Sequence, residues 1–360
     1  MRIAIDCRMI GSGGIGSYSS ALLPFFIQKH ECTLLGRAEQ LEPFRDSSAA
    51  LVECTVPPFS IKELLCFPAD IAKKINACDV FYSPYCNVPS GIRVPVFTTI
   101  HDVVFLDVKA LASPLGTFIR KVFYMRAVQK SAAVFTVSEF SAERIRHHLK
   151  CRKPLVVTYN AVPAWFCEED SSASDNTAMS EDAFSDASDS VLFVGNIKKH
   201  KGLSVLVDAF VAARERGLPL KLLLVGNKDN FRTGDTEVFE KIERAPAGSV
   251  RFTGKISDSQ LKTLYKTARF LVQPSFYEGF GMPPLEAMSL GCPVIMSDIP
   301  VFKEIYRDFP VTFFACGDAD DLAKKMLAKA FEERKTISLP NIYSFERTFS
   351  LIEKTLCARQ

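Results

Sequence analysis

Residues 270–300 read FLVQPSFYEGFGMPPLEAMSLGCPVIMSDIP, and this stretch carries the most informative pattern in the chain. An apolar run that ends at Ser275 predicts a buried strand, and the loop after it contains Glu278 between aromatic and glycine residues. The Pro-Pro pair predicts the first turn of a helix, which the glycine of SLG would end. Glu278 on the loop and Glu286 in the first helical turn are therefore expected at the mouth of a sheet. The free N–H groups of the helix N-terminus would suit a phosphate there.

Strand-like and helix-like runs alternate on both sides of an acidic segment. Short apolar runs such as VPVFTTIHDV and SVLFVGN alternate with amphipathic runs such as GTFIRKVFYMRAVQKS and KGLSVLVDAFVAARERG. This alternation predicts a parallel sheet with helices on both faces. Because the alternation occurs twice, we expect an α/β fold of two doubly wound, Rossmann-like domains. Ligands would bind in a cleft at the carboxyl ends of the strands.

The acidic segment marks the domain boundary. From Cys167 to Ser190 the chain has eight acidic residues and no basic one, among many serines and alanines. Such a composition has too little apolar surface to offset the entropy lost on ordering, which predicts a mobile insertion. The expected organisation is a first domain at 1–163, the acidic linker at 164–190, a second domain at 191–342, and a last helix at 343–360 that packs back toward the first domain.

Composition excludes several classes of protein. A net charge of +3 over 360 residues implies no nucleic-acid partner. The 11 cysteines are odd in number and form no C-x-x-C pair, which indicates reduced thiols rather than disulfides or a zinc site. The start MRIAID predicts a strand rather than a signal peptide, and no apolar run is long enough for a membrane span. We expect a soluble, cytoplasmic protein. Without a D-x-D motif or a cluster of ligands at metal spacing, no metal is expected.

The stretch GSGGIG, Gly11 to Gly16, has the G-x-G-x-x-G form of a dinucleotide-binding loop. Four residues separate Asp6 from Gly11, however, and the next strand-like run ends on Gly36 and Arg37 rather than on an acidic residue. An NAD-dependent dehydrogenase is therefore the weaker interpretation. A glycine-rich loop between a strand and a helix still favours an anion, since it presents backbone N–H groups.

The stretch EGFGMPPLEAM, two glutamates with seven residues between them, resembles the signature of the retaining glycosyltransferases of family 4, which have the GT-B fold. Other stretches resemble motifs of that family in the same order along nearly the whole chain. They are GGIGSY, TIHDV, TVSEFSAERI, YNAV, VLFVGNIKKHKGL, FTGKISDSQLKTLYKTA and YSFERTF.

The resemblance implies that 1–163 is the acceptor-side domain and 191–342 the nucleotide-sugar-binding domain, and it gives roles to particular residues. Glu286 would bind the ribose hydroxyls of a sugar nucleotide, and Glu278 would face the donor sugar or the reacting centre. Lys201 would neutralise the diphosphate leaving group, and His101 would contact the sugar and the acceptor side. The other expected donor-binding positions are Gly14, Ile15, Gly16, Asn196, Lys255, Ile256, Gly279, Phe280, Gly281, Met282 and Leu285.

One position departs from the family pattern. Asn196 stands where many members have an arginine, so one of two expected cations is missing. Lys198 or Lys199 could compensate, and the sequence does not choose between them.

The resemblance implies transfer of a hexose, with retention and without a metal or other cofactor, from a nucleotide-diphosphate sugar. GDP-mannose is favoured over a UDP-sugar, and the acceptor would be a glycan or a lipid-linked hydroxyl in bacterial surface polysaccharide and lipopolysaccharide synthesis. A GT-B sugar-nucleotide epimerase or a catalytically inactive scaffold would share the same fold.

The basic, partly apolar stretch GTFIRKVFYMRAVQKSA has two interpretations. It is either an ordinary core helix or a surface of the first domain that touches the inner face of a membrane.

Overall fold

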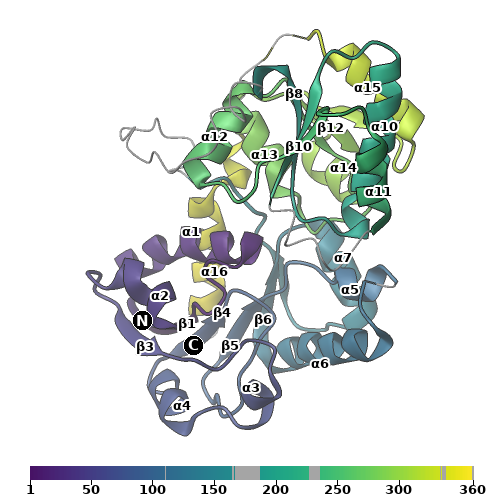
Figure 1. Ribbon diagram of the computed structural model, residues 1–360. Coiled ribbons are helices and arrows are strands. Elements are labelled where there is room, and N and C mark those ends of the chain that lie inside the picture. Colours follow the sequence, from purple (N-terminus) through teal and green to yellow (C-terminus); the bar gives the residue numbers. More distant parts are fainter. Residues whose placement is uncertain are drawn as a thin grey trace. The chain divides into compact units, whose positions relative to one another are not determined.

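A computed structural model describes residues 1–109, 111–163, 166, 187–226, 236–332, 334 and 338–358 (Figure 1). The chain divides into two compact units. The first unit comprises Met1–Ala161 with Pro340–Gln360, and the second comprises Val162–Leu339. Most of the expected acidic linker lies outside the described residues, which resume with a 3-10 helix at Ala187–Asp189.

The first unit is built on a seven-stranded, fully parallel sheet. The strand order reverses between β1 and β4, where Ile3 pairs with Val80. Such a reversal is the point at which open α/β sheets bind ligands, beyond the carboxyl ends of the strands. In spatial order the strands are β3 (Ala50–Glu53), β2 (Glu31–Gly36), β1 (Arg2–Asp6), β4 (Val80–Ser83), β5 (Val96–Thr99), β6 (Ser131–Thr136) and β7 (Leu155–Val157).

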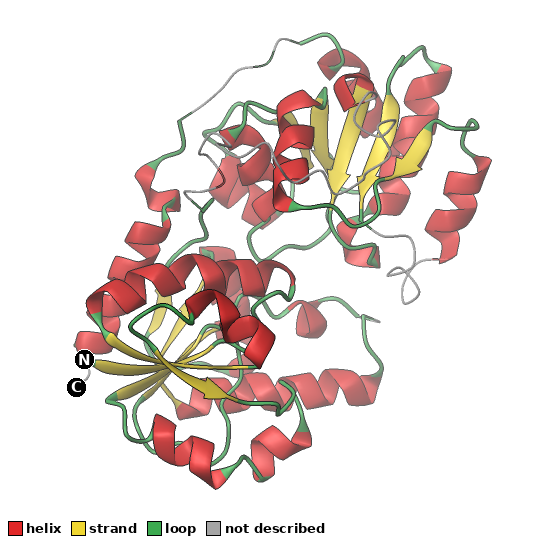
Figure 2. Ribbon diagram, turned by 60° about the vertical axis from the view of Figure 1, so that its left-hand side comes forward, coloured by secondary structure: helices red, strands yellow, loops and turns green. Residues whose placement is uncertain are grey.

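Helices cover both faces of this sheet (Figure 2). Ile3 and Ile5 point into a core with α1 (Gly13–Lys29) and the last helix, α16 (Phe345–Cys357). Ala4, between them, belongs to the opposite core, which α4 (Ala69–Ile75), α6 (Pro114–Lys130) and α7 (Glu139–Leu149) complete. Helix α16 lies against α1, where the rings of Phe25 and Phe349 stack with centroids 5.7 Å apart. The shorter helices are α2 (Ala38–Leu41), α3 (Ile61–Leu65) and α5 (Val104–Asp107).

The second unit repeats this plan with a six-stranded parallel sheet. The order is β10 (Val250–Phe252), β9 (Lys221–Val225), β8 (Ser190–Val194), β11 (Phe270–Gln273), β12 (Val294–Ser297) and β13 (Thr312–Phe314). The reversal now falls between β8 and β11. Helices α10 (Leu203–Glu215) and α15 (Ala319–Lys329) pack on one face around Phe193 and Phe210. The other α-helices in the described residues of this unit are α11 (Thr236–Arg244), α12 (Asp258–Thr267), α13 (Met282–Ser289) and α14 (Pro300–Tyr306).

Two local expectations were wrong. The residues from Gly14 to Gly16 form the first turn of α1 rather than a loop. Helical hydrogen bonding begins early, since the Gly16 N–H donates to the Ser12 carbonyl, and a Cβ on Gly16 would lie 2.6 Å from the Met9 carbonyl oxygen. Likewise α13 begins at Met282, which puts Glu286 in its second turn and weakens the influence of the helix dipole on that carboxylate.

Within the described ranges, no helix combines the length and the apolar composition that crossing a bilayer requires.

Candidate active site

Lys201 and Glu278 form an ion pair at the carboxyl edge of the second unit's sheet. The Lys201 Nζ lies 2.8 and 2.7 Å from the two carboxylate oxygens of Glu278. Glu278, which is only 8% exposed, also accepts hydrogen bonds from the Ser275 hydroxyl at 2.7 Å and from the Gln273 amide at 3.1 Å. Four donated hydrogen bonds hold this carboxylate in one orientation.

The loop that carries Lys201 is held against the end of β11. The Phe276 N–H donates to the His200 carbonyl at 2.8 Å. Gly202 has a φ of +68°, and a Cβ there would lie 2.0 Å from the Pro274 carbonyl oxygen, so only glycine fits. The 3-10 turn at Lys199–Lys201 therefore depends on the glycine that follows it. Burial, together with the charge of Lys201, lowers the pKa of His200 to about 4, so this imidazole adds no positive charge at neutral pH.

Glu286 has a different environment on α13. Burial raises the pKa of its carboxyl group to about 7, although the Tyr265 hydroxyl on α12 donates a hydrogen bond to it at 2.9 Å. Tyr265 is buried and its pKa is well above the usual value, so it remains a neutral donor. Because the pKa of this carboxyl group is about 7, a ligand that donates hydrogen bonds to the carboxylate stabilises the charged form.

The N-terminus of α13 is less suited to an anion than the sequence indicated. Pro283 and Pro284 have no N–H, so Met282 and Leu285 supply the only backbone donors among the first four helical residues. Gly281 precedes the helix with a φ of +91°, and its carbonyl accepts the Tyr306 hydroxyl. A Cβ on Gly281 would lie 2.5 Å from the Phe302 ring, which makes this glycine a structural requirement.

The other expected donor-binding residues of the second unit differ in how far they are exposed to solvent. Phe280 and Leu285 are buried, which leaves only their backbones for a ligand, and Gly279 is buried as well. Asn196 is exposed after β8, as are Lys198 and Lys199. Lys255 is exposed and Ile256 half-buried on the turn before α12, at the carboxyl end of β10.

In the first unit, His101 follows β5 at the carboxyl edge of the sheet. Its Nε2 lies 2.9 Å from the Pro84 carbonyl oxygen, which can only accept, so Nε2 carries the proton. Burial lowers the pKa of this imidazole to about 4, and it is therefore neutral at neutral pH. The His101 ring meets the Tyr18 ring edge-on with centroids 4.8 Å apart, which places it beside the N-terminal turns of α1. Gly14 is exposed there, whereas Ile15 is half-buried.

Sequence reasoning missed the supporting side chains. Gln273, Ser275 and Tyr265 lie in stretches that read as an ordinary strand end and helix, so only their contacts show their role. It also missed a buried cluster under the first unit's edge, where the Arg8 guanidinium pairs with both Asp6 (2.6 Å) and Glu63. The Tyr85 hydroxyl donates to Asp6 at 2.7 Å, and this cluster joins the ends of β1 and β4.

In the described parts of the chain, no group of three or more His, Cys, Asp or Glu side chains is placed to hold a metal ion.

Comparison with known proteins matches part of the chain to a described family. Residues 175–337 match the family described as glycosyl transferases group 1. O-antigen chain mannosyltransferase B of Escherichia coli is 36% identical over 120 residues, which cover 32% of this chain and 30% of that protein. O-antigen chain mannosyltransferase RfbU of Salmonella typhimurium is 55% identical over 56 residues, 16% of each chain. The matches thus span less than a third of either relative.

A solved structure shows the same fold over the whole chain. HepE of Anabaena in complex with UDP-glucose matches with a TM-score of 0.73 and covers 99% of this chain and 100% of its own, at 16% identity. That likeness confirms the expected GT-B architecture of two parallel-sheet α/β domains. Both of these sequence relatives are named as mannosyltransferases.

Proposed function

Because residues 175–337 of this chain match the group 1 glycosyl transferases, we propose that the protein transfers a hexose from a nucleotide-diphosphate sugar to an acceptor hydroxyl. The observation that carries this proposal is the ion pair between Lys201 and Glu278, next to the reversal of strand order in the second sheet. It puts a cation and a fixed carboxylate where such sheets bind ligands.

The second unit binds the donor in this proposal. Lys201 stabilises the negative charge that develops on the departing diphosphate, which is the step where a fixed charge accelerates the reaction most. Glu286 accepts the ribose hydroxyls, and Glu278 accepts from the sugar while it holds Lys201 in place. A catalytically inactive scaffold is disfavoured because the chain retains all three side chains.

Neutral His101 acts on the acceptor side. Its proton lies on Nε2, so Nδ1 can accept a hydrogen bond from a hydroxyl group. Retention of the anomeric configuration, same-face attack and independence of metal ions are parts of the same proposal.

The names of the relatives guide the choice of substrates. Two are O-antigen chain mannosyltransferases, which supports mannose as the sugar and a glycan or lipid-linked acceptor of bacterial surface polysaccharide. GDP-mannose is therefore the first donor to test. A UDP-sugar is the second, because HepE was solved with UDP-glucose. An acceptor on a lipid would place the enzyme at the inner face of a membrane.

A thermal-shift panel of GDP- and UDP-sugars tests the donor, followed by product analysis with a mannosyl-terminated acceptor. We expect GDP-mannose to raise the melting temperature and free GDP to appear only when acceptor is present. Conversion of a nucleotide sugar without acceptor would instead identify an epimerase. No shift with any nucleotide sugar would contradict the proposal.

A further inference from the structure

Exposed apolar side chains gather on one part of the first unit. Of the 11 large apolar side chains that are exposed in the described residues, seven belong to α3, α6 or the residues just before them. Ile61 and Leu65 are 75% and 73% exposed on α3, and Phe118 is 63% exposed on α6. We call this set the apolar ridge: Phe59, Ile61, Leu65, Leu115, Phe118, Ile119 and Val122. Contiguous apolar surface of this kind indicates a binding surface, whereas scattered apolar residues do not.

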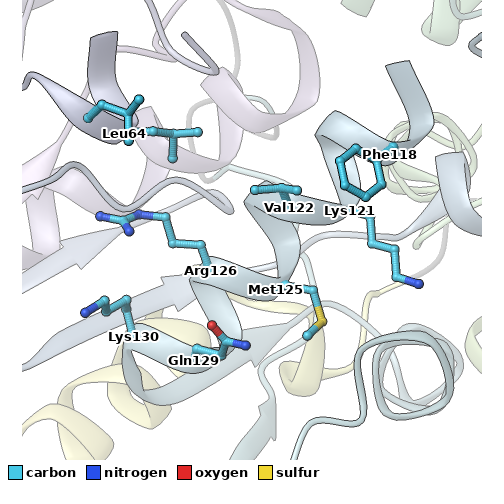
Figure 3. Close-up of a pocket in the computed structure, with 9 residues that line it drawn as sticks. Leu64, Phe118, Lys121, Val122, Met125, Arg126, Gln129 and Lys130 are labelled. Carbon is cyan, nitrogen blue, oxygen red and sulfur yellow. The ribbon is translucent and has the colours of Figure 1, made fainter. Parts of the chain in front are cut away.

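A cavity of about 420 Å³ separates the two helices of the ridge. Figure 3 shows Leu64 of α3 on one side and Phe118 and Val122 of α6 on the other. Met125 and Arg126 continue the lining along α6. The ridge therefore has two apolar edges with a groove between them.

Both helices are fixed to the same backbone segment, which follows β4. On α3, Glu63 is buried, pairs with Arg8 and accepts the Asn87 amide at 2.6 Å. On α6, Arg126 donates to the carbonyl oxygens of Val88 at 2.7 Å and Pro89 at 3.2 Å. The inner sides of the helices are thus held by charged groups, while their apolar side chains point outward. The ridge is a preformed surface.

On the surfaces of the two ridge helices, α3 and α6, the exposed charges have a single sign. Helix α6 contains no acidic residue, and its basic residues include Lys121 and Lys130 beside the cavity. The only acidic residue of α3 is Glu63, which is buried and paired, whereas Lys62 is exposed. An apolar surface bordered by cations matches the interface of an anionic lipid bilayer, where apolar side chains enter the acyl boundary and lysines meet phosphates.

We infer that the apolar ridge inserts into an anionic lipid bilayer and holds the carboxyl edge of the first unit's sheet at the membrane. Both ridge helices are connected to that edge. Glu63 of α3 pairs with Arg8, which follows β1. Helix α6 begins a short segment after His101. The inference rests on the proposed function only in that a lipid-linked acceptor would benefit from this placement. It names both α3 and α6 as the contact, where the sequence indicated α6 alone.

Co-sedimentation of the full-length chain with vesicles tests the inference without donor or acceptor. We expect binding to vesicles of phosphatidylcholine with phosphatidylglycerol, loss of most binding at high salt, and little binding to phosphatidylcholine alone. Phe118→Ser should weaken the partition coefficient about tenfold, because one phenylalanine leaves the acyl boundary. Phe331→Ser removes a side chain that is 75% exposed in the second unit and should change nothing.

The charge contribution has its own pair of variants. Lys121→Ala should weaken vesicle binding and reduce its dependence on salt, whereas Lys354→Ala on α16, also exposed, should have no effect. An equal loss of vesicle binding in the ridge variants and in the control variants would overturn the inference. So would absence of vesicle binding at low salt, or binding of monomeric short-chain phosphatidylglycerol without vesicle binding.

The nucleotide thermal shift separates this inference from the proposed function. All four variants should melt near the wild-type temperature and keep the same shift with GDP-mannose, since none lies in the donor site. Vesicle binding without any nucleotide shift would contradict the proposed function alone. A nucleotide shift without vesicle binding would contradict the membrane inference alone.

Discussion

Lys201 donates to both carboxylate oxygens of Glu278, at 2.8 and 2.7 Å, although 77 positions separate the two residues in the chain. The side chain of Lys201 is 22% exposed and that of Glu278 is 9% exposed, so the pair is partly accessible to solvent. A lysine ammonium has three donors and can keep one on Glu278 while it turns another toward a phosphate. Glu278 therefore holds the ammonium group of Lys201 in position.

Lys201→Ala should lower kcat more than it raises KM for the donor, because the charge on the leaving group develops in the transition state. Glu278→Gln should retain an acceptor for Ser275 but lose the ion pair, which frees Lys201 and also lowers kcat. Steady-state kinetics with GDP-mannose measure both. Lys198→Ala and Lys199→Ala are the matched controls, since both lysines are exposed on the same loop. A kcat near the wild-type value in Lys201→Ala would transfer the role to one of them.

Donor affinity should depend on the protonation of Glu286. Burial raises the pKa of this carboxyl group to about 7, and only the ionised form accepts two ribose hydroxyls. Calorimetric affinity should therefore rise between about pH 6 and pH 8. Glu286→Gln should remove this dependence, and Tyr265→Phe should shift it to higher pH because the carboxylate loses a hydrogen-bond donor. A flat profile in the wild-type protein would contradict the assignment.

Glu286→Ala should weaken donor binding by about 1.5–3 kcal/mol, roughly tenfold to a hundredfold, with the fold intact.

The raised pKa of Glu286 also affects the pH dependence of stability. Between pH 4.5 and about 7 the folded state binds more protons at Glu286 than the unfolded chain does. The contribution of this group to stability therefore falls as the pH rises through that window.

Gly202→Ala should disrupt the turn that presents Lys201. The new Cβ would lie 2.0 Å from the Pro274 carbonyl oxygen, in addition to the cost of about 1–2 kcal/mol for a φ of +68°. Gly217→Ala is the control, because its φ is +96° but no atom lies within 4 Å of the new Cβ. Both variants should melt at a lower temperature, and only Gly202→Ala should lose kcat. Equal activity in the two would show that the turn tolerates displacement.

Arg8→Met should destabilise the first unit by about 3–5 kcal/mol, since Asp6 and Glu63 would be left buried without their cation. Urea unfolding followed by a probe in the first unit measures the loss. Arg2→Met breaks the exposed pair with Asp79 and should have little effect, as surface pairs contribute little. A wild-type midpoint in Arg8→Met would mean that the buried carboxyl groups tolerate neutralisation.

Local sequence patterns determined the repeated α/β architecture. Apolar β-rich runs and amphipathic helices are short-range signals, and the helices α6 and α10 begin and end within two residues of the stretches GTFIRKVFYMRAVQKS and KGLSVLVDAFVAARERG. The same patterns located Glu278 and Glu286 near a strand end and a helix start. They were off by one turn at Gly14 and at Glu286, where backbone hydrogen bonds and glycine neighbours, rather than periodicity, decide the first helical residue.

Only the tertiary structure decided which of these residues meet. The contact between Lys201 and Glu278 depends on β8 and β11 being neighbours in the sheet, and strand order is a long-range property that periodicity does not encode. The pKa of Glu286 depends on burial beneath α12, and the buried cluster of Arg8 depends on three separate segments. The proposed membrane contact also needed the fold, because the sequence of α6 alone fits a core helix as well. The fold supports a surface role for α6 because α3 lies across the same cavity and carries further exposed apolar side chains. Both helices make hydrogen bonds to the segment that follows β4.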